Sequence, residues 1–375
     1  MDFIQNPRRR SDTVLSYGNR TIEDIEAELR AHFATQYQRF IFQGLIGRGA
    51  FGLTFCAVER LSMDTCRRIA IKRSLDPRRE DDLRNEITWL KTLRGAEHIV
   101  RLLASRDDPD PMASFRRAPR LSMYRPLGLQ DSLEGLTGPI AVLEYLENAD
   151  IARLYERLVK YDQLLPNRIL WSFFLCLIRA CIALAYPPNR TEDQETRLET
   201  VPTDGRAPSF IEHADLHPAN VMIGTAGLGF PEHSIVPPLK FIDFGRTREG
   251  FQGVSDNVWK ISRIMINLIA RQEVRISAWI TDYQGFETRA TEILHHGNGA
   301  KYPTLDDDLR DFLARCLADE TRDRPGLAYM LQRAEDTVRN KTAAAFPGQP
   351  GETDEAIAAL VNRFVYDAEI EGSGS

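Results

Sequence analysis

The string HADLHPAN occupies residues 213–220, and the string LKFIDFG follows at residues 239–245. In the first string, Asp215 and Asn220 stand five residues apart in a polar loop. One of these side chains can accept the proton of a substrate hydroxyl, and the other can hold a metal ion. In the second string, Asp243 ends an apolar run and a glycine follows closely. A carboxylate at such a strand end suits Mg²⁺, which prefers oxygen ligands.

A glycine-rich turn lies far upstream. The string GRGAFG, with Gly47, Gly49 and Gly52, separates two apolar runs at residues 40–46 and 53–60 that we predict to be strands. Glycines let a turn approach phosphate groups without a clash at Cβ. In dinucleotide-binding folds the last glycine opens a helix. Here a strand follows, which favours a flap over a nucleotide.

A charged pair is predicted just beyond this turn. Lys72 ends the apolar run IAIK, a predicted strand at residues 69–72, and Glu86 lies in a predicted helix at residues 80–94. A lysine within an apolar strand is costly to bury alone. A carboxylate from the next helix would stabilise the ammonium group and direct it toward phosphate oxygens. A lysine that reaches solvent from the strand end remains the alternative interpretation.

The remaining periodicity places strands in the first part of the chain and helices in the second, which predicts two lobes. Further strands are expected at His98–Leu103, Ile140–Leu146, 221–223 and 239–242. Further helices are expected at 21–39 (capped by Thr21), 151–161, 167–185, 256–270, 307–317 and 325–340. Polar segments at 105–138, 187–210 and 224–238 predict surface loops.

Composition narrows the class of protein. The chain has 375 residues, of which 43% are hydrophobic, and a net charge of −6. An acidic chain is a poor match for nucleic acid, because a surface that follows phosphates needs an excess of Lys and Arg. Five cysteines without a CxxC pair argue against a disulfide framework or a zinc site, and favour a reducing compartment. We therefore expect a cytoplasmic protein, and the basic run Arg8–Arg10 leaves a nuclear address open.

The most apolar stretch, residues 169–186, is short for a bilayer span and carries Arg179 in its middle. We expect it to be a helix buried in a core, and we expect no membrane partner.

The glycine turn, the lysine and glutamate, the HADLHPAN loop and DFG occur in one order, and their combination resembles the protein kinase family. The resemblance covers roughly residues 40–340. The run AVLEYLENADI resembles the family's hinge, with Leu143 as gatekeeper and Glu144 to Leu146 at the adenine edge. The run SDNVWKIS resembles the start of a later helix, with Asp256 as its buried aspartate, which would hold the backbone around His213. His213 itself is implied to be structural, stacked with Phe244 and Leu90. The run LARCLADETRDRP resembles a late helix with its arginine, Arg324.

The resemblance implies an α+β bilobal fold, with a small β-rich N-lobe containing one main helix and a larger, mostly helical C-lobe. The expected layout is an N-terminal extension at 1–39, the N-lobe and hinge at 40–146, the C-lobe at 147–340, and a linker, short helix and tail at 341–375. It also implies ATP and Mg²⁺ as cofactors. By the resemblance, Gly47, Gly49 and Gly52 would cover the phosphates, and Lys72, paired with Glu86, would bind them. Asp215 would accept the proton, and Asn220 and Asp243 would bind Mg²⁺. Glu144 and Leu146 would contact the adenine.

The chain departs from the family at three places. Ala214 replaces an arginine that normally pairs with a phosphate on the activation loop. His217 stands where serine/threonine kinases usually carry a lysine; when protonated, it could partly replace that lysine and give the activity a pH dependence. The stretch from Gly245 to Asp256 is short and lacks the Ala-Pro-Glu motif that closes the shelf for a peptide. Arg324 therefore lacks its usual glutamate partner unless Glu249 or another acid substitutes.

Three functions stay open. The first is a serine/threonine protein kinase, the second a metabolite kinase on the same fold, and the third a pseudokinase that acts as a binding module. The partners would be ATP and a protein or small-molecule acceptor. A C-terminal apolar stripe at Ile357, Leu360, Val361 and Phe364 predicts a helix that packs on the body or docks on a partner.

Overall fold

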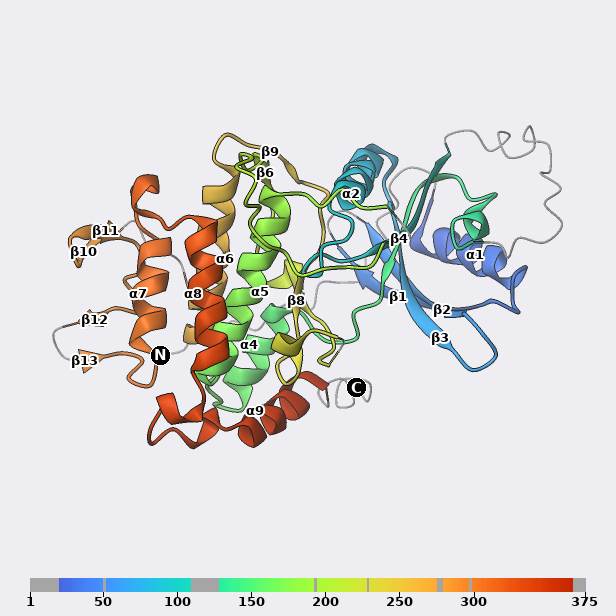
Figure 1. The fold of residues 1–375 in the computed structure, drawn as a ribbon. Coiled ribbons are helices and arrows are strands. Elements are labelled where there is room, and N and C mark those ends of the chain that lie inside the picture. Colours follow the sequence, from blue (N-terminus) through green and yellow to red (C-terminus); the bar gives the residue numbers. More distant parts are fainter. Residues whose placement is uncertain are drawn as a thin grey trace, which may run out of the picture. The chain divides into compact units, whose positions relative to one another are not determined.

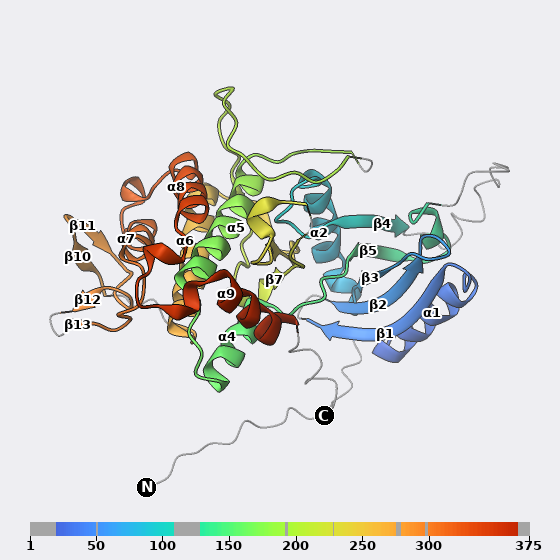
Figure 2. The ribbon, with the colours of Figure 1, turned by 60° about the horizontal axis from the view of Figure 1, so that its bottom comes forward.

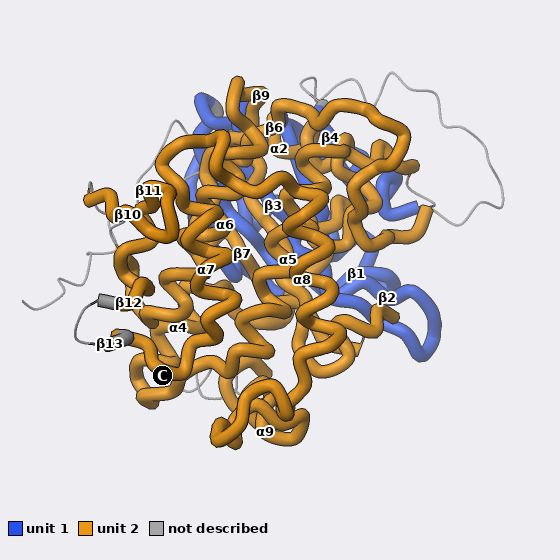
Figure 3. Tube along the Cα trace, turned by 60° about the vertical axis from the view of Figure 1, so that its left-hand side comes forward, with its two compact units in different colours: residues 1–84, 103–143 blue, residues 85–102, 144–375 orange. Residues whose placement is uncertain are grey.

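The computed structural model describes residues 20–49, 52–108, 128–191, 194–227, 229–274, 279–296 and 299–366. The basic run Arg8–Arg10 and two residues of the glycine turn, Ala50 and Phe51, lie outside these ranges. The chain divides into two compact units (Figure 3). Residues 1–84 and 103–143 form one, called here the sheet unit, and residues 85–102 and 144–375 form the other, the helical unit.

The sheet unit is built on five strands in the order β1-β2-β3-β5-β4. They are β1 (Phe40–Arg48), β2 (Leu53–Arg60), β3 (Cys66–Arg73), β4 (Leu102–Asp108) and β5 (Gly138–Glu144). The mixed α+β class is confirmed, with an antiparallel sheet. The strand expected at His98–Leu103 is wrong at its start, because residues 98–100 instead form backbone hydrogen bonds with Phe241 of the helical unit.

One face of the sheet is covered by the helix α1 (Ile22–Ala34), which lies along β1 (Figure 2). Thr21 begins the helix: its hydroxyl accepts from the N–H of Asp24, whose carboxylate accepts from the N–H of Thr21. The core of the unit combines residues of α1 with residues from the covered face of the sheet. They include Ile25, Leu29, Phe33, Leu53, Phe55, Ala57, Ile69 and Ile71. The N-terminal helix therefore packs on its own unit.

The helical unit confirms the predicted helices. They are α4 (Ile151–Lys160), α5 (Asn167–Ala185), α6 (Gly253–Ala270), α7 (Asp307–Cys316), α8 (Leu327–Asn340) and α9 (Asp354–Val361), while α2 (Glu80–Thr92) begins in the sheet unit and continues into this one. The central helix α5 packs against both α6 and α8 (Figure 1). Its length and apolar composition would suffice for a membrane span, but 94% of the apolar window is buried inside the protein, as in a core helix.

Short strand pairs connect these helices. They are β6 (Ile211–Glu212) with β9 (Arg248–Glu249), β7 (Val221–Ile223) with β8 (Leu239–Phe241), β10 (Thr281–Tyr283) with β11 (Phe286–Thr288), and β12 (His295–His296) with β13 (Gly299–Ala300). The first two pairs flank the predicted site residues, because the HADLHPAN loop joins β6 to β7 and the DFG segment joins β8 to β9.

The C-terminal segment packs on the helical unit. Of the predicted apolar stripe, Ile357, Val361 and Phe364 are buried and Leu360 is half-buried. The carboxylate of Glu352 accepts hydrogen bonds from the backbone N–H groups of Asn167 (2.6 Å) and Arg168 (3.1 Å). Glu352 therefore gives a hydrogen-bond acceptor to two N–H groups that have no partner within the helix. Its negative charge is also favourable at the N-terminus of α5.

Segments predicted as surface loops contain buried residues. Leu129, Leu133 and Leu136, from the segment 105–138, belong to the core of the sheet unit. Glu199 and His233, from the other two segments, are buried in the helical unit. Leu129, Leu133 and Leu136 stand four and three residues apart, a helical spacing that the loop prediction overlooked. Glu199 and His233 are polar residues, which hydrophobic periodicity cannot reveal.

Candidate functional site

The loop between β6 and β7 holds two of the predicted site residues in a fixed arrangement. The Nδ2 atom of Asn220 donates to the backbone oxygen of Asp215 at 2.7 Å, so Oδ1 is the atom of that amide with which a cation could be bound. Asp215 is half-buried, and its N–H donates to the oxygen of His213 at 2.8 Å. Ala214 between them has φ of +60°, a conformation that costs energy for a residue with Cβ.

The segment at the end of β8 joins this loop. The N–H of Ile242 donates to the backbone oxygen of Asn220 at 3.0 Å, and Nε2 of His213 donates to the oxygen of Ile242 at 3.0 Å. The rings of His213 and Phe244 lie 4.8 Å apart. Ile242, which is hydrogen-bonded to Asn220, is followed directly by Asp243. The two predicted Mg²⁺ ligands are therefore brought together within the helical unit.

His213 is held neutral. Burial lowers the pKa of its imidazole to about 4, although the Ile242 carbonyl and the charges of Asp243 and Asp215 partly oppose this effect. Because Nε2 donates to a carbonyl, the proton of the neutral ring resides on that nitrogen. A structural role, as the sequence predicted, fits this neutral ring better than proton transfer.

The prediction that Asp256 is the buried residue supporting His213 is wrong by one position. Asn257 is 1% exposed, its Oδ1 accepts from the N–H of His213 at 3.2 Å, and its Nδ2 donates to the oxygen of Ile211 at 2.8 Å. Asp256 is only half-buried. An amide serves here because it can accept from one backbone group and donate to another, which an ionised carboxylate cannot do.

Asp243 itself has φ of +63°, the left-handed region that aspartate tolerates better than most residues. The residues that follow are held by α2. Asn85 donates to the backbone oxygens of Gly245 (2.9 Å) and Thr247 (2.8 Å), and the indole of Trp89 donates to that of Thr247 at 2.9 Å. Sequence reasoning missed Asn85 and Trp89. No local pattern signals them, because their role depends on α2 lying against the chain after Gly245.

The route from Gly245 to α6 is direct. After β9 pairs with β6, only a short turn precedes Gly253, where the helix begins. The Glu212 carboxylate contacts Lys260 (2.7 Å) and Arg248 (3.2 Å). Burial would raise the pKa of Glu212, but these two cations outweigh it and lower the pKa. On the outside of this turn, the Phe251 side chain is 93% exposed.

Arg324 does not use Glu249, which is exposed on β9. Its guanidinium donates to the hydroxyl of Ser255 at 2.7 Å and lies over the ring of Trp259 at 4.9 Å. Burial lowers the pKa of Arg324, and Asp256 is the acid that opposes this most. Arg324 therefore has a hydroxyl and an aromatic ring as its contacts at the start of α6.

In the sheet unit, the strand register aligns two predicted phosphate-binding residues. Gly47 of β1 is paired with Thr54 of β2, and Thr54 is paired with Lys72 of β3. Ile71 and Phe55 belong to the core under α1, so the alternation of strands places Lys72 and Thr54 on the opposite face. The predicted strand–turn–strand arrangement around the glycines is confirmed.

Gly52 has a steric reason to be glycine. A Cβ at this position would lie 2.5 Å from the backbone oxygen of Arg73, closer than real contacts allow. The N–H of Gly49 donates to the oxygen of Gly52 at 2.9 Å and closes the turn. At Gly47 a Cβ would meet Thr54 only at ordinary contact distance, so this unit does not itself require glycine there.

Of the two predicted adenine-contact residues, Glu144 ends β5 and Leu146 follows it. The N–H of Glu144 donates to the oxygen of Arg101 at 2.9 Å, and its carboxylate accepts from Lys240 at 3.0 Å. The side chain and the N–H of Glu144 are thus used by the protein itself. Leu146 is half-buried, Glu86 is 1% exposed, and His217 is exposed. The pairing of Lys72 with Glu86 stays a prediction.

No family model matches the chain. The assignment of chemistry therefore depends on the residues. A half-buried carboxylate, an amide and a second carboxylate on two joined loops can orient a hydroxyl and bind a divalent cation.

Proposed function

We propose that the chain is an ATP- and Mg²⁺-dependent phosphotransferase with the bilobal fold of the protein kinase family. The supporting observation is that two loops of the helical unit are hydrogen-bonded to each other. The loop with Asp215 and Asn220 is hydrogen-bonded at 3.0 Å to the residue that precedes Asp243. Phosphoryl transfer demands little covalent chemistry from the protein, and it depends on positioning and charge. Rigid backbone hydrogen bonds between the two loops supply such positioning.

In this proposal, Asp215 orients the acceptor hydroxyl and receives its proton. Asn220, through Oδ1, and Asp243, through its carboxylate, hold the metal. Bound Mg²⁺ would neutralise charge on the phosphate oxygens. Neutral His213 keeps the two loops joined without adding a charge near the metal.

The sheet unit would contribute the nucleotide contacts. Gly47, Gly49 and Gly52 would cover the phosphates, and Lys72, on the face opposite α1, would bind them. From the helical unit, Glu86 would pair with Lys72. The adenine would meet the carbonyl of Glu144 and the backbone of Leu146. The alignment of Gly47, Thr54 and Lys72 across three strands supports the phosphate contacts.

For the acceptor, we propose a serine or threonine hydroxyl of a protein. A metabolite hydroxyl is the second candidate, and a specific observation favours it: only residues 246–252 separate the DFG segment from α6, and β9 within them pairs with β6. That leaves few residues to form a peptide shelf. A cytoplasmic location, with a nuclear one open, belongs to the same proposal. It is supported by the five free cysteines.

The test is ATP turnover by the full chain with Mg²⁺, comparing wild type with Asp215→Asn and Asp243→Asn. Removal of a general base lowers rates by about 10²–10⁴-fold, and we expect such a loss in Asp215→Asn. Asp243→Asn removes a proposed metal ligand and should lose the Mg²⁺-dependent turnover. Asp282→Asn, in the exposed part of β10, is the control and should retain full activity.

Generic protein acceptors and small alcohols are then offered separately. Transfer to proteins alone supports the protein kinase, and transfer to alcohols alone supports the metabolite kinase. Mg²⁺-dependent ATP binding without turnover in wild type would instead identify a binding module. Equal turnover in wild type and both site variants would refute the proposed site.

A further inference from the structure

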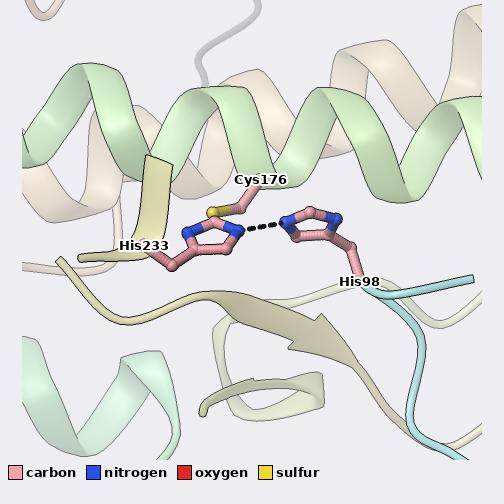
Figure 4. A group of neighbouring side chains, drawn as sticks. All are labelled: His98, Cys176 and His233. Atoms are coloured by element: carbon pink, nitrogen blue, oxygen red, sulfur yellow. Dashed lines mark hydrogen bonds between the residues drawn. The ribbon is translucent and has the colours of Figure 1, made fainter. Parts of the chain in front are cut away.

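A second cluster of chemically active side chains lies in the core of the helical unit, apart from the phosphotransferase residues. It consists of His98, Cys176 and His233, and Figure 4 shows the three side chains directed toward one another. Cys176 comes from the middle of α5, His98 from the segment before β4, and His233 from the connection between β7 and β8. Their exposed fractions are 0%, 0% and 3%.

The distances fit metal coordination. One nitrogen from each ring and the Cys176 sulfur all lie within 4.8 Å of one another, and the Nε2 atoms of His98 and His233 are 3.1 Å apart. Around tetrahedral Zn²⁺, two histidine nitrogens stand about 3.3 Å apart, and a nitrogen and a sulfur about 3.6 Å apart. Only small side-chain movements separate the hydrogen-bonded cluster from a coordinating one.

A carboxylate orients the first histidine. Glu199 accepts from Nδ1 of His98 at 2.7 Å and from the His98 backbone N–H at 2.8 Å. This fixes the ring so that Nε2 faces the cluster. Metal-ligating histidines almost always carry such a partner on their second nitrogen. Arg179 in turn donates to the Glu199 backbone oxygen at 2.6 Å.

The charges of the cluster favour a divalent cation. Cys176 as thiolate and Glu199 as carboxylate bring two negative charges into a dry core, and a divalent cation cancels both. Arg179 adds no excess charge, because it is paired with Glu232 and Glu335. Imidazole and thiolate together favour Zn²⁺ among divalent ions. An oxygen of Glu232 lies 3.4 Å from Nε2 of His233, but it accepts from Arg179 at 2.8 Å, so it would become the fourth ligand only by giving up that bond.

We propose that His98, Cys176 and His233 form a structural Zn²⁺ site, with Glu199 as the positioning residue for His98. Binding releases the thiol proton and the proton shared by the two rings. The sequence argued against zinc because no CxxC pair occurs, but a site assembled from three distant segments needs no such pair. The oxygen of His98 accepts from the N–H of Phe241 at 2.9 Å, so the ion would brace β8 just before Asp243.

The experiment uses the full chain, purified without chelator and assayed for zinc by mass spectrometry. After chelator treatment, Co²⁺ is added as a spectroscopic probe. Cys176→Ala is compared with Cys181→Ala, which removes an equally buried thiol from the same helix outside the cluster. We expect one Zn²⁺ per chain and a sulfur-to-cobalt absorption band in wild type and Cys181→Ala. Both should be lost in Cys176→Ala.

Glu199→Gln should weaken zinc affinity by about 10–100-fold in competition with a chromophoric chelator. If Cys176→Ala fails to fold by circular dichroism, His233→Gln replaces it and should also lose the metal. The proposal is overturned if folded wild type binds neither Zn²⁺ nor Co²⁺, if Cys176→Ala keeps the cobalt band, or if copper alone co-purifies. None of these outcomes depends on phosphotransferase activity, so the two proposals can fail separately.

Discussion

Replacement of His213 by glutamine should flatten the pH dependence of stability in the mildly acidic range. The imidazole is fully buried, and its pKa is lowered from 6.5 to about 4. Each pKa unit corresponds to about 1.36 kcal/mol, so the full difference is worth about 3 kcal/mol. Glutamine keeps a donor for the oxygen of Ile242 and does not titrate.

The sign follows from which state binds the proton. Above pH 6.5, His213 is neutral in both the folded and the unfolded chain. As the pH falls below 6.5, the unfolded chain takes up a proton that the folded chain does not. Stability is therefore lost between pH 6.5 and about 4, and the loss is already about 2 kcal/mol near pH 5.

The measurement is the free energy of unfolding in urea, followed by circular dichroism, at about pH 7 and about pH 5. The change between the two pH values should be about 2 kcal/mol larger in wild type than in His213→Gln. His295→Gln, at an exposed histidine, is the control and should behave like wild type. An identical pH dependence in wild type and His213→Gln would refute a neutral, buried His213.

Two further predictions concern buried contacts. Asn257→Leu leaves the N–H of His213 and the oxygen of Ile211 unpaired in the core, and we expect a loss of about 2–6 kcal/mol in urea unfolding. Asp256→Ala should cost less, and the reverse ranking would restore the role predicted for Asp256. Glu352→Gln should lower stability by about 2 kcal/mol, because a charge is removed from the N-terminus of α5. Thermal unfolding measures this loss, exposed Glu355→Gln is the control, and equal melting of the two variants would contradict the capping role.

Local signals in the chain were sufficient for most elements. The bounds of β2 and α5 agree with the sequence predictions, because hydrophobic periodicity and breakers act over a few residues. The bond between Asn220 and Asp215 also spans only five residues, so the loop could be read as a unit. We expected a metal-binding carboxylate at Asp243 because the residue stands at the end of a predicted strand, and β8 is that strand.

Tertiary packing decided the contacts between segments that are distant in the sequence. Successive helix residues differ by about 100° in direction, so which of Asp256 and Asn257 faces His213 depends on how α6 meets β6. Asn85 and Trp89 gain their role only because α2 lies against the chain after Gly245.

His98, Cys176 and His233 come together for the same reason. They stand on three segments that no local pattern connects, and Glu199 reaches them from a fourth. Such a meeting is specified by the fit of whole elements around α5, since burial of its apolar surface draws these segments inward and their polar side chains must then find partners.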